Sequence, residues 1–122
     1  MHWSKVKYFN PSEFVCQCGC GRGAGEMNEQ FMLALDAARK EAGIPFRITS
    51  GFRCPSHNAR VGGVKDSAHA KGLAADISIV NSAARVIILR ALLRYFDRLG
   101  VGKRFVHVDM DPSRSVPVMW VY

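Results

Sequence analysis

Helical periodicity is the clearest pattern in the chain. Apolar residues recur every three or four positions in residues 26–43, and the stripe they form is Met27, Phe31, Ala34, Leu35 and Ala38. Gly43 follows the last turn, where a glycine commonly ends a helix. A second stripe predicts a helix over residues 82–100, with Ser82 as its N-cap and Gly100 at its end. The apolar positions of this second stripe are Val86, Leu89, Leu92, Leu93 and Phe96.

Alternation of apolar and polar residues predicts strands elsewhere. The predicted strands are residues 45–53, 73–80, 104–110 and 116–122. Residues 54–68 show neither period and contain the pair Gly62-Gly63, so we expect a long loop there. This mixture of elements predicts an α+β fold, with a mostly antiparallel sheet and helices packed on one side.

The alternation also assigns side chains to the two faces of the predicted sheet. In residues 45–53, Phe46 and Ile48 share a face. In residues 73–80 one face carries Ala75, Ile77 and Ile79, and the other carries Ala74, Asp76 and Ser78. In residues 104–110 one face carries Phe105, His107 and Asp109. If the last two of these strands are neighbours, their polar faces can meet.

Composition limits the class of protein. The chain has 122 residues, 48% of them hydrophobic, which favours one packed domain over residues 1–122. Residues 1–25 show little regular pattern and contain the sequence CQCGCGRGAG, so we separate this N-terminal segment from a core of residues 26–122. No apolar run is long enough to span a membrane. We also expect the protein to be a monomer.

The charge and the N-terminus bear on partners and location. Seventeen Lys and Arg against ten Asp and Glu give a net charge of +7, which favours polyanionic partners such as nucleic acid or the polymers of a bacterial envelope. The basic residues are scattered, so we expect a solvated basic surface and no specific nucleic-acid site. The N-terminal sequence MHWSKVKYFNPSEF lacks the apolar region of a signal peptide, which predicts synthesis in the cytoplasm.

The four cysteines allow two interpretations. Cys16, Cys18 and Cys20 alternate, and Cys54 follows Arg53. Four thiols invite a structural zinc site, although the spacing C-x-C-x-C does not suit one tetrahedral ion well. Disulfides between Cys54 and one of the other three are the alternative, in an oxidising compartment. The spacing does not decide, and we interpret the segment as a structural lid or tether near Arg53.

Two histidines and a carboxylate form a candidate metal site. His69 and Asp76 flank a run of small residues that leaves room for another group, and His107 lies on a predicted strand. Two imidazoles, one carboxylate and an open fourth position for water make a catalytic zinc site. Each residue alone is more typical of a structural role, such as a hydrogen-bonded histidine or an aspartate in a turn.

Three segments carry a resemblance to a known family. SGFRCPSHNARVGG, SAHAKGLAADI and FVHVDMD, in this order and with these gaps, resemble the D-alanyl-D-alanine metallopeptidases. That family includes zinc D,D-carboxypeptidases, L,D-carboxypeptidases and phage endolysins. The resemblance covers residues 9–111 and implies that His69, Asp76 and His107 hold one catalytic zinc ion.

The resemblance also implies roles for two residues beside the metal. Arg53 matches a family arginine whose guanidinium can polarise the scissile carbonyl or hold a substrate carboxylate. Ser67 would orient a metal ligand or a group of the substrate. The plainer interpretations are a surface salt bridge for Arg53 and the cap of a turn for Ser67.

The position where the family usually carries its general base, the group that accepts a proton from water, departs from the family pattern. Many relatives carry Glu, Asp or His two or three residues before the last metal ligand, where this chain has Phe105 and Arg104. Asp109 is the best substitute, either as the general base or as a carboxylate that orients the histidine ligand. His57 and Asp66 are weaker candidates.

By this resemblance we expect a zinc-dependent peptidase that cleaves stem or cross-link peptides of peptidoglycan. The absence of a signal peptide favours a phage or prophage endolysin, released through a holin or carried on the virion, that acts on the bacterial cell wall. The positive charge would aid adhesion to anionic envelope polymers. The alternative is a catalytically weak, zinc-containing module of the same fold that binds wall peptides. A nucleic-acid protein ranks third, since it gives the His and Asp residues no purpose.

Overall fold

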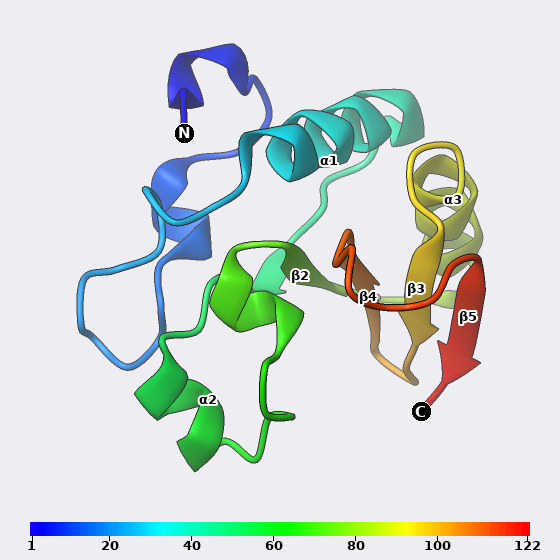
Figure 1. Ribbon diagram of the computed structural model, residues 1–122. Coiled ribbons are helices and arrows are strands. Elements are labelled where there is room, and N and C mark those ends of the chain that lie inside the picture. Colours follow the sequence, from blue (N-terminus) through cyan, green and yellow to red (C-terminus); the bar gives the residue numbers. More distant parts are fainter.

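The computed structural model describes residues 1–122 as three α-helices and a five-stranded sheet (Figure 1). The α-helices are α1 (Glu29–Ala42), α2 (Pro55–Arg60) and α3 (Ser82–Leu92). The strands are β1 (Ile48–Ser50), β2 (Ala74–Ser78), β3 (Arg98–Val101), β4 (Phe105–Asp109) and β5 (Val118–Val121). Three short 3-10 helices are η1 (Trp3–Lys5), η2 (Pro11–Phe14) and η3 (Ala68–Lys71). None of the helices is both long and apolar enough to cross a membrane.

The sheet has the strand order β1-β2-β4-β3-β5. Every neighbouring pair is antiparallel except β3 and β5, which run parallel. The helices α1 and α3 pack against each other on one face of this sheet. The predicted α+β fold, with a mostly antiparallel sheet and helices on one side, is therefore confirmed.

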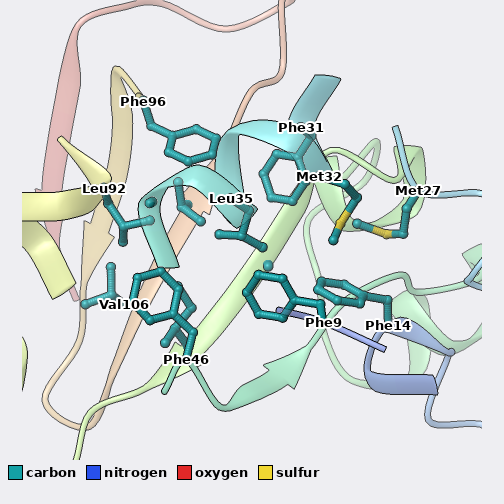
Figure 2. Packing of buried hydrophobic residues seen from close by; sticks show 14 of the residues in the cluster. Phe9, Phe14, Met27, Phe31, Met32, Leu35, Phe46, Leu92, Phe96 and Val106 are labelled. Atoms are coloured by element: carbon teal, nitrogen blue, oxygen red, sulfur yellow. The ribbon is translucent and has the colours of Figure 1, made fainter. Parts of the chain in front are cut away.

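The core lies between these two helices and the sheet (Figure 2). Helix α1 contributes Phe31 and Leu35, both fully buried as its apolar stripe predicts, and also Met32, which the stripe did not include. The side chain of Asn28 accepts a hydrogen bond from the amide of Phe31 and caps the start of α1. Gly43 ends the helix with a φ of +69°, as predicted.

The N-terminal segment packs onto α1. The carboxylate of Asp36 on α1 accepts hydrogen bonds from the amides of Lys7 and Tyr8, at 3.1 and 2.8 Å. The rings of Phe9 and Phe14 enter the core cluster and meet edge to face. This segment therefore supplies part of the core, although its sequence shows little regular pattern.

The prediction of one helix over residues 82–100 is wrong. Helix α3 ends at Leu92, a turn follows, and residues from Arg98 onward form β3. Phe96 is buried, as the apolar stripe predicts, and Leu99 is also buried, but a strand at residues 98–101 pairs with the backbone groups of β4 and β5 beside it. Gly100 therefore belongs to a strand and does not end a helix.

Other local predictions also need correction. Asn81, and not Ser82, caps α3, because its side chain accepts a hydrogen bond from the amide of Ala84. Val86 and Leu93 are exposed, whereas Ile88 is buried. The expected long loop over residues 54–68 contains α2, which begins with a proline at its first position, a favourable place for that residue.

Candidate metal centre and active site

One row of residues runs across four strands of the sheet. Asp76 on β2 pairs with His107 on β4, Gly100 on β3 pairs with His107, and Trp120 on β5 pairs with Gly100. Side chains alternate along a strand, so this row faces away from α1 and α3. A side chain at position 100 would come within 2.5 Å of the indole nitrogen of Trp120. Glycine thus leaves room for the indole, whose ring centre lies 5.5 Å from that of His107.

His69 comes from η3, the turn that leads into β2. Ser67 caps this turn, and its hydroxyl accepts a hydrogen bond from the amide of His69 at 3.2 Å. Gly72 ends the turn with a φ of +71°, and its carbonyl accepts a hydrogen bond from the amide of Asn28 at 2.9 Å. His69 is thereby held from both sides and is buried.

Three polar groups converge where η3 meets the sheet. Nε2 of His69 lies 3.3 Å from Oδ1 of Asp76, and Nδ1 of His107 lies 2.9 Å from the same oxygen. Ligand atoms of the three residues all lie within 4.8 Å of one another. The structure therefore brings the three predicted metal ligands together.

Hydrogen bonds on the far side of each ring determine which nitrogen can bind a metal. Nδ1 of His69 donates to the carbonyl oxygen of Gly51 at 2.8 Å, which leaves the lone pair of a neutral ring on Nε2. Nε2 of His107 donates to Oδ2 of Asp109 at 2.7 Å, which leaves Nδ1 for the metal. Both free nitrogens face Asp76, and this support of each ligand ring is typical of metal sites.

Asp109 is held on both of its oxygens. Oδ2 accepts the hydrogen bond from His107, and Oδ1 accepts one from Nε of Arg98 at 2.7 Å and one from the amide of Asp111 at 3.2 Å. Burial opposes its ionisation, but the bonds from His107 and Arg98 outweigh that effect and lower the pKa of Asp109. This geometry favours the role of orienting His107 over the role of general base.

The protonation equilibria of the metal-free site reflect the same contacts. Burial disfavours charge on Asp76, yet the imidazoles of His107 and His69 can donate hydrogen bonds to it when they carry a second proton, and these contacts hold its pKa well below the usual range. Burial also disfavours charge on His107, but Asp109 and Asp76 outweigh it and raise the pKa of the imidazole. A carboxylate and two supported imidazoles at this separation form a donor set that fits a tetrahedral zinc ion with one open position.

An open cavity of about 540 Å³ gives access to these groups. Arg53 lines it, and its Nη2 lies 3.6 Å from Oδ2 of Asp76. The guanidinium is held by the side chains of Ser50 and Asn58, at 3.2 and 3.3 Å. Ser67 also lines the cavity. The two remaining candidates, His57 and Asp66, do not line it.

Sequence reasoning gave no role to Arg98 and Trp120, which both line this cavity. Arg98 was expected inside a helix, but β3 directs it to Asp109, and its guanidinium carbon lies 5.1 Å from the centre of the Trp120 ring. Trp120 was expected on a strand without a role. The alternation of Leu99 and Val101 around Gly100 is the one local signal that indicates a strand here.

Two comparisons with known proteins bear on this site. A search of curated proteins found no match. The model of a protein family described as Peptidase M15 matches residues 7–109, which is most of the chain and includes all three candidate ligands. The chain therefore belongs to the M15 peptidase family, the D-alanyl-D-alanine metallopeptidases.

Proposed function

We propose that this protein is a zinc-dependent peptidase that cleaves stem or cross-link peptides of peptidoglycan. The observation that carries the proposal is the convergence of His69, Asp76 and His107 beside an open cavity. Zinc peptidases use two histidines and one carboxylate and leave a fourth position open. Zinc bound by these residues would supply Lewis-acid polarisation of a peptide carbonyl and would raise the acidity of water.

The chain's own residues would bind and orient the substrate. Arg53 presents a guanidinium, held by two side chains, to the cavity that adjoins the three ligands. Its N–H groups can donate to the carbonyl oxygen of the scissile bond, or to a carboxylate of the stem peptide, and so stabilise developing negative charge. Trp120 and Tyr122 provide an aromatic wall against which the substrate can pack.

We further propose that the protein acts as an endolysin of a phage or prophage, as a monomer. It would be made in the cytoplasm and would reach the cell wall through a holin or on the virion. The net charge of +7 supports this setting, because anionic wall polymers would attract the protein to its substrate.

The shortage of a free proton acceptor in the cavity motivates a second candidate function. Among the residues that line the cavity, the only carboxylates and imidazoles are the three candidate ligands and Asp109. Both oxygens of Asp109 already accept hydrogen bonds, and those from His107 and Arg98 lower its pKa, which makes it a weak proton acceptor. If it accepts no proton from water, the protein is a zinc-containing module that binds wall peptides without efficient cleavage.

Digestion of purified peptidoglycan tests the two candidates. The zinc-loaded protein and a His69→Ala control are incubated with the polymer, and the products are identified by mass spectrometry. New peptide fragments that the control does not release would support the peptidase, and their masses would identify the bond. Intact peptidoglycan that nevertheless retains the zinc-loaded protein would refute cleavage and support the binding module.

Asp109→Asn separates the two roles of this residue. The amide keeps the shape but no longer holds His107 as a carboxylate does. If Asp109 orients the ligand, the variant loses zinc affinity, and activity returns when zinc is added in excess. If Asp109 is the base, zinc affinity stays near normal and kcat remains low at any zinc concentration.

A further inference from the structure

A second group of metal-binding side chains lies outside the site described above. The sulfur atoms of Cys16, Cys18, Cys20 and Cys54 all lie within 4.8 Å of one another. Sγ of Cys18 is 3.4 Å from that of Cys16 and 3.6 Å from that of Cys54. Four thiolates on one zinc ion, at Zn–S distances of about 2.3 Å, stand about 3.8 Å apart. The cluster therefore has the size of a single tetrahedral metal site.

The backbone explains how such closely spaced cysteines reach one point. In an extended strand, alternate residues would all point to one side and would lie too far apart to share an ion. Here Gly19 and Gly21 have φ values of +85° and +80°, which turn the chain on both sides of Cys20. The amide of Cys16 donates to the carbonyl of Arg22 at 2.7 Å and closes the loop. The expectation that C-x-C-x-C does not suit one ion therefore does not apply to this loop.

Backbone amides also point at two of the sulfurs. The amide of Cys54 donates to Sγ of Cys16 at 3.3 Å, and the amide of His57 donates to Sγ of Cys54 at 3.4 Å. Hydrogen bonds of this kind favour the negatively charged thiolate that a metal requires. Cys16 and Cys54 are buried, so their sulfurs are shielded from bulk water.

The arrangement favours a shared ion over disulfides. A disulfide joins sulfurs in separate pairs, whereas Cys18 lies nearly equally far from Cys16 and from Cys54. All four cysteines are free thiols in the structure. Four sulfur ligands in a tetrahedral arrangement select zinc or iron among the common metals. The four sulfur atoms lie within 4.8 Å of one another, which is too close for them to surround a cluster of several irons.

We propose that Cys16, Cys18, Cys20 and Cys54 bind one structural zinc ion. This ion would join residues 16–20 to the segment that follows β1 and carries Arg53.

The position of the proposed ion gives it a role in the architecture of the active site. Cys54 directly follows Arg53, which lines the cavity. In the same segment the amide of Phe52 donates to the carbonyl of Phe14 at 3.0 Å, and the carbonyl of Gly51 accepts the hydrogen bond from His69. A zinc ion at the cysteines would therefore stabilise a segment that positions both Arg53 and a metal ligand.

Zinc stoichiometry of the purified full chain tests the proposal. Elemental analysis should find two zinc ions per chain in the wild type, one in Cys18→Ser/Cys20→Ser and one in His69→Ala/His107→Ala. Each double variant is the control for the other, because each removes one site. A result of one zinc ion per chain in the wild type and also one in Cys18→Ser/Cys20→Ser would overturn the proposal.

Measurements that need no cysteine variant keep the test valid if that variant does not fold. In His69→Ala/His107→Ala, X-ray absorption at the zinc edge should show sulfur neighbours alone, at about 2.3 Å. A mercurial reagent that modifies thiols should release one zinc ion, and a chelator should lower the melting temperature. Zinc with nitrogen or oxygen neighbours, iron in place of zinc, or thiols that react only after reduction would each refute the proposal.

Discussion

Gly72→Ala tests whether the turn after His69 holds this candidate metal ligand in place, and Gly43→Ala is its matched control. Both glycines end a helical segment, with φ values of +71° and +69°. A Cβ at position 43 would meet no atom within 4 Å. A Cβ at position 72 would collide with the backbone carbonyl oxygen of Glu26 and lie 2.8 Å from its carbonyl carbon. The two substitutions thus share the conformational strain and differ in the clash.

The expected magnitudes follow from this difference. An alanine in the left-handed region costs about 1 kcal/mol, which is the whole effect expected for Gly43→Ala. Gly72→Ala adds the cost of displacing packed backbone, typically about 1–3 kcal/mol, for a total of about 2–4 kcal/mol. At about 4 °C per kcal/mol for a domain of this size, melting temperatures should fall by about 4 °C and about 8–16 °C respectively.

The clash should also displace His69 and so weaken zinc binding. The amide of Gly72 donates to the carbonyl of His69 at 3.4 Å, so a shift of the turn moves the ligand. We expect Gly72→Ala to lose about tenfold or more in zinc affinity, the size of effect seen when the support of a ligand is lost. Gly43→Ala, at the far end of α1, should keep the wild-type affinity.

Differential scanning calorimetry and competition with a chromophoric zinc chelator measure the two effects. Both are carried out on the purified variants side by side, in the same buffer. Equal melting temperatures for the two variants would refute the clash argument. A destabilised Gly72→Ala protein with unchanged zinc affinity would refute the link between this turn and the metal ligand.

Three further predictions rest on other contacts. Arg53→Lys should lower kcat/KM on peptidoglycan fragments by about a hundredfold with zinc content unchanged, because the planar, two-pronged N–H donor of arginine is lost. Chromatography of the released products measures this change. Although burial opposes ionisation, hydrogen bonds from Ser113 and Lys71 lower the pKa of Asp111 to about 2. About 2 kcal/mol of stability should therefore be present above about pH 4 and lost as pH falls toward 2; urea unfolding at a series of pH values should show this loss, and Asp111→Asn should lack it. Because the pKa of His107 is raised in the metal-free protein and zinc needs the neutral ring, zinc affinity should fall with decreasing pH; calorimetry in buffers of different ionisation enthalpy should detect the released proton.

Local sequence patterns predicted much of the fold, and together with the family resemblance they predicted all three candidate ligands. Helix α1 follows from its apolar stripe and from Gly43, since both signals act within one or two turns. The faces of β2 and β4 follow from strict alternation, which assigned Asp76 and His107 to the polar faces of their strands. His69 could be chosen because it precedes one of these strands by a short run of small residues.

Predictions failed where a segment has a local pattern that suits two structures. Residues 93–101 continue the apolar stripe of α3, but the last four of them also alternate, and these four form β3. Strand pairing with β4 and β5 decides between the two, and neither partner is near in sequence to α3. Arg98 was missed for this reason, because its contact with Asp109 exists only in the strand.

The chain alone thus indicated which residues are candidate metal ligands, since residue type and spacing are local properties. Contacts between distant segments determined how these residues are arranged. Strand pairing puts Asp76 opposite His107, and the hydrogen bonds to Gly51 and Asp109 then determine which ring nitrogens face Asp76. The convergence of Cys54 with three cysteines more than thirty residues away has the same origin. Such contacts depend on packing and hydrogen bonding across the whole domain, which no short stretch of sequence encodes.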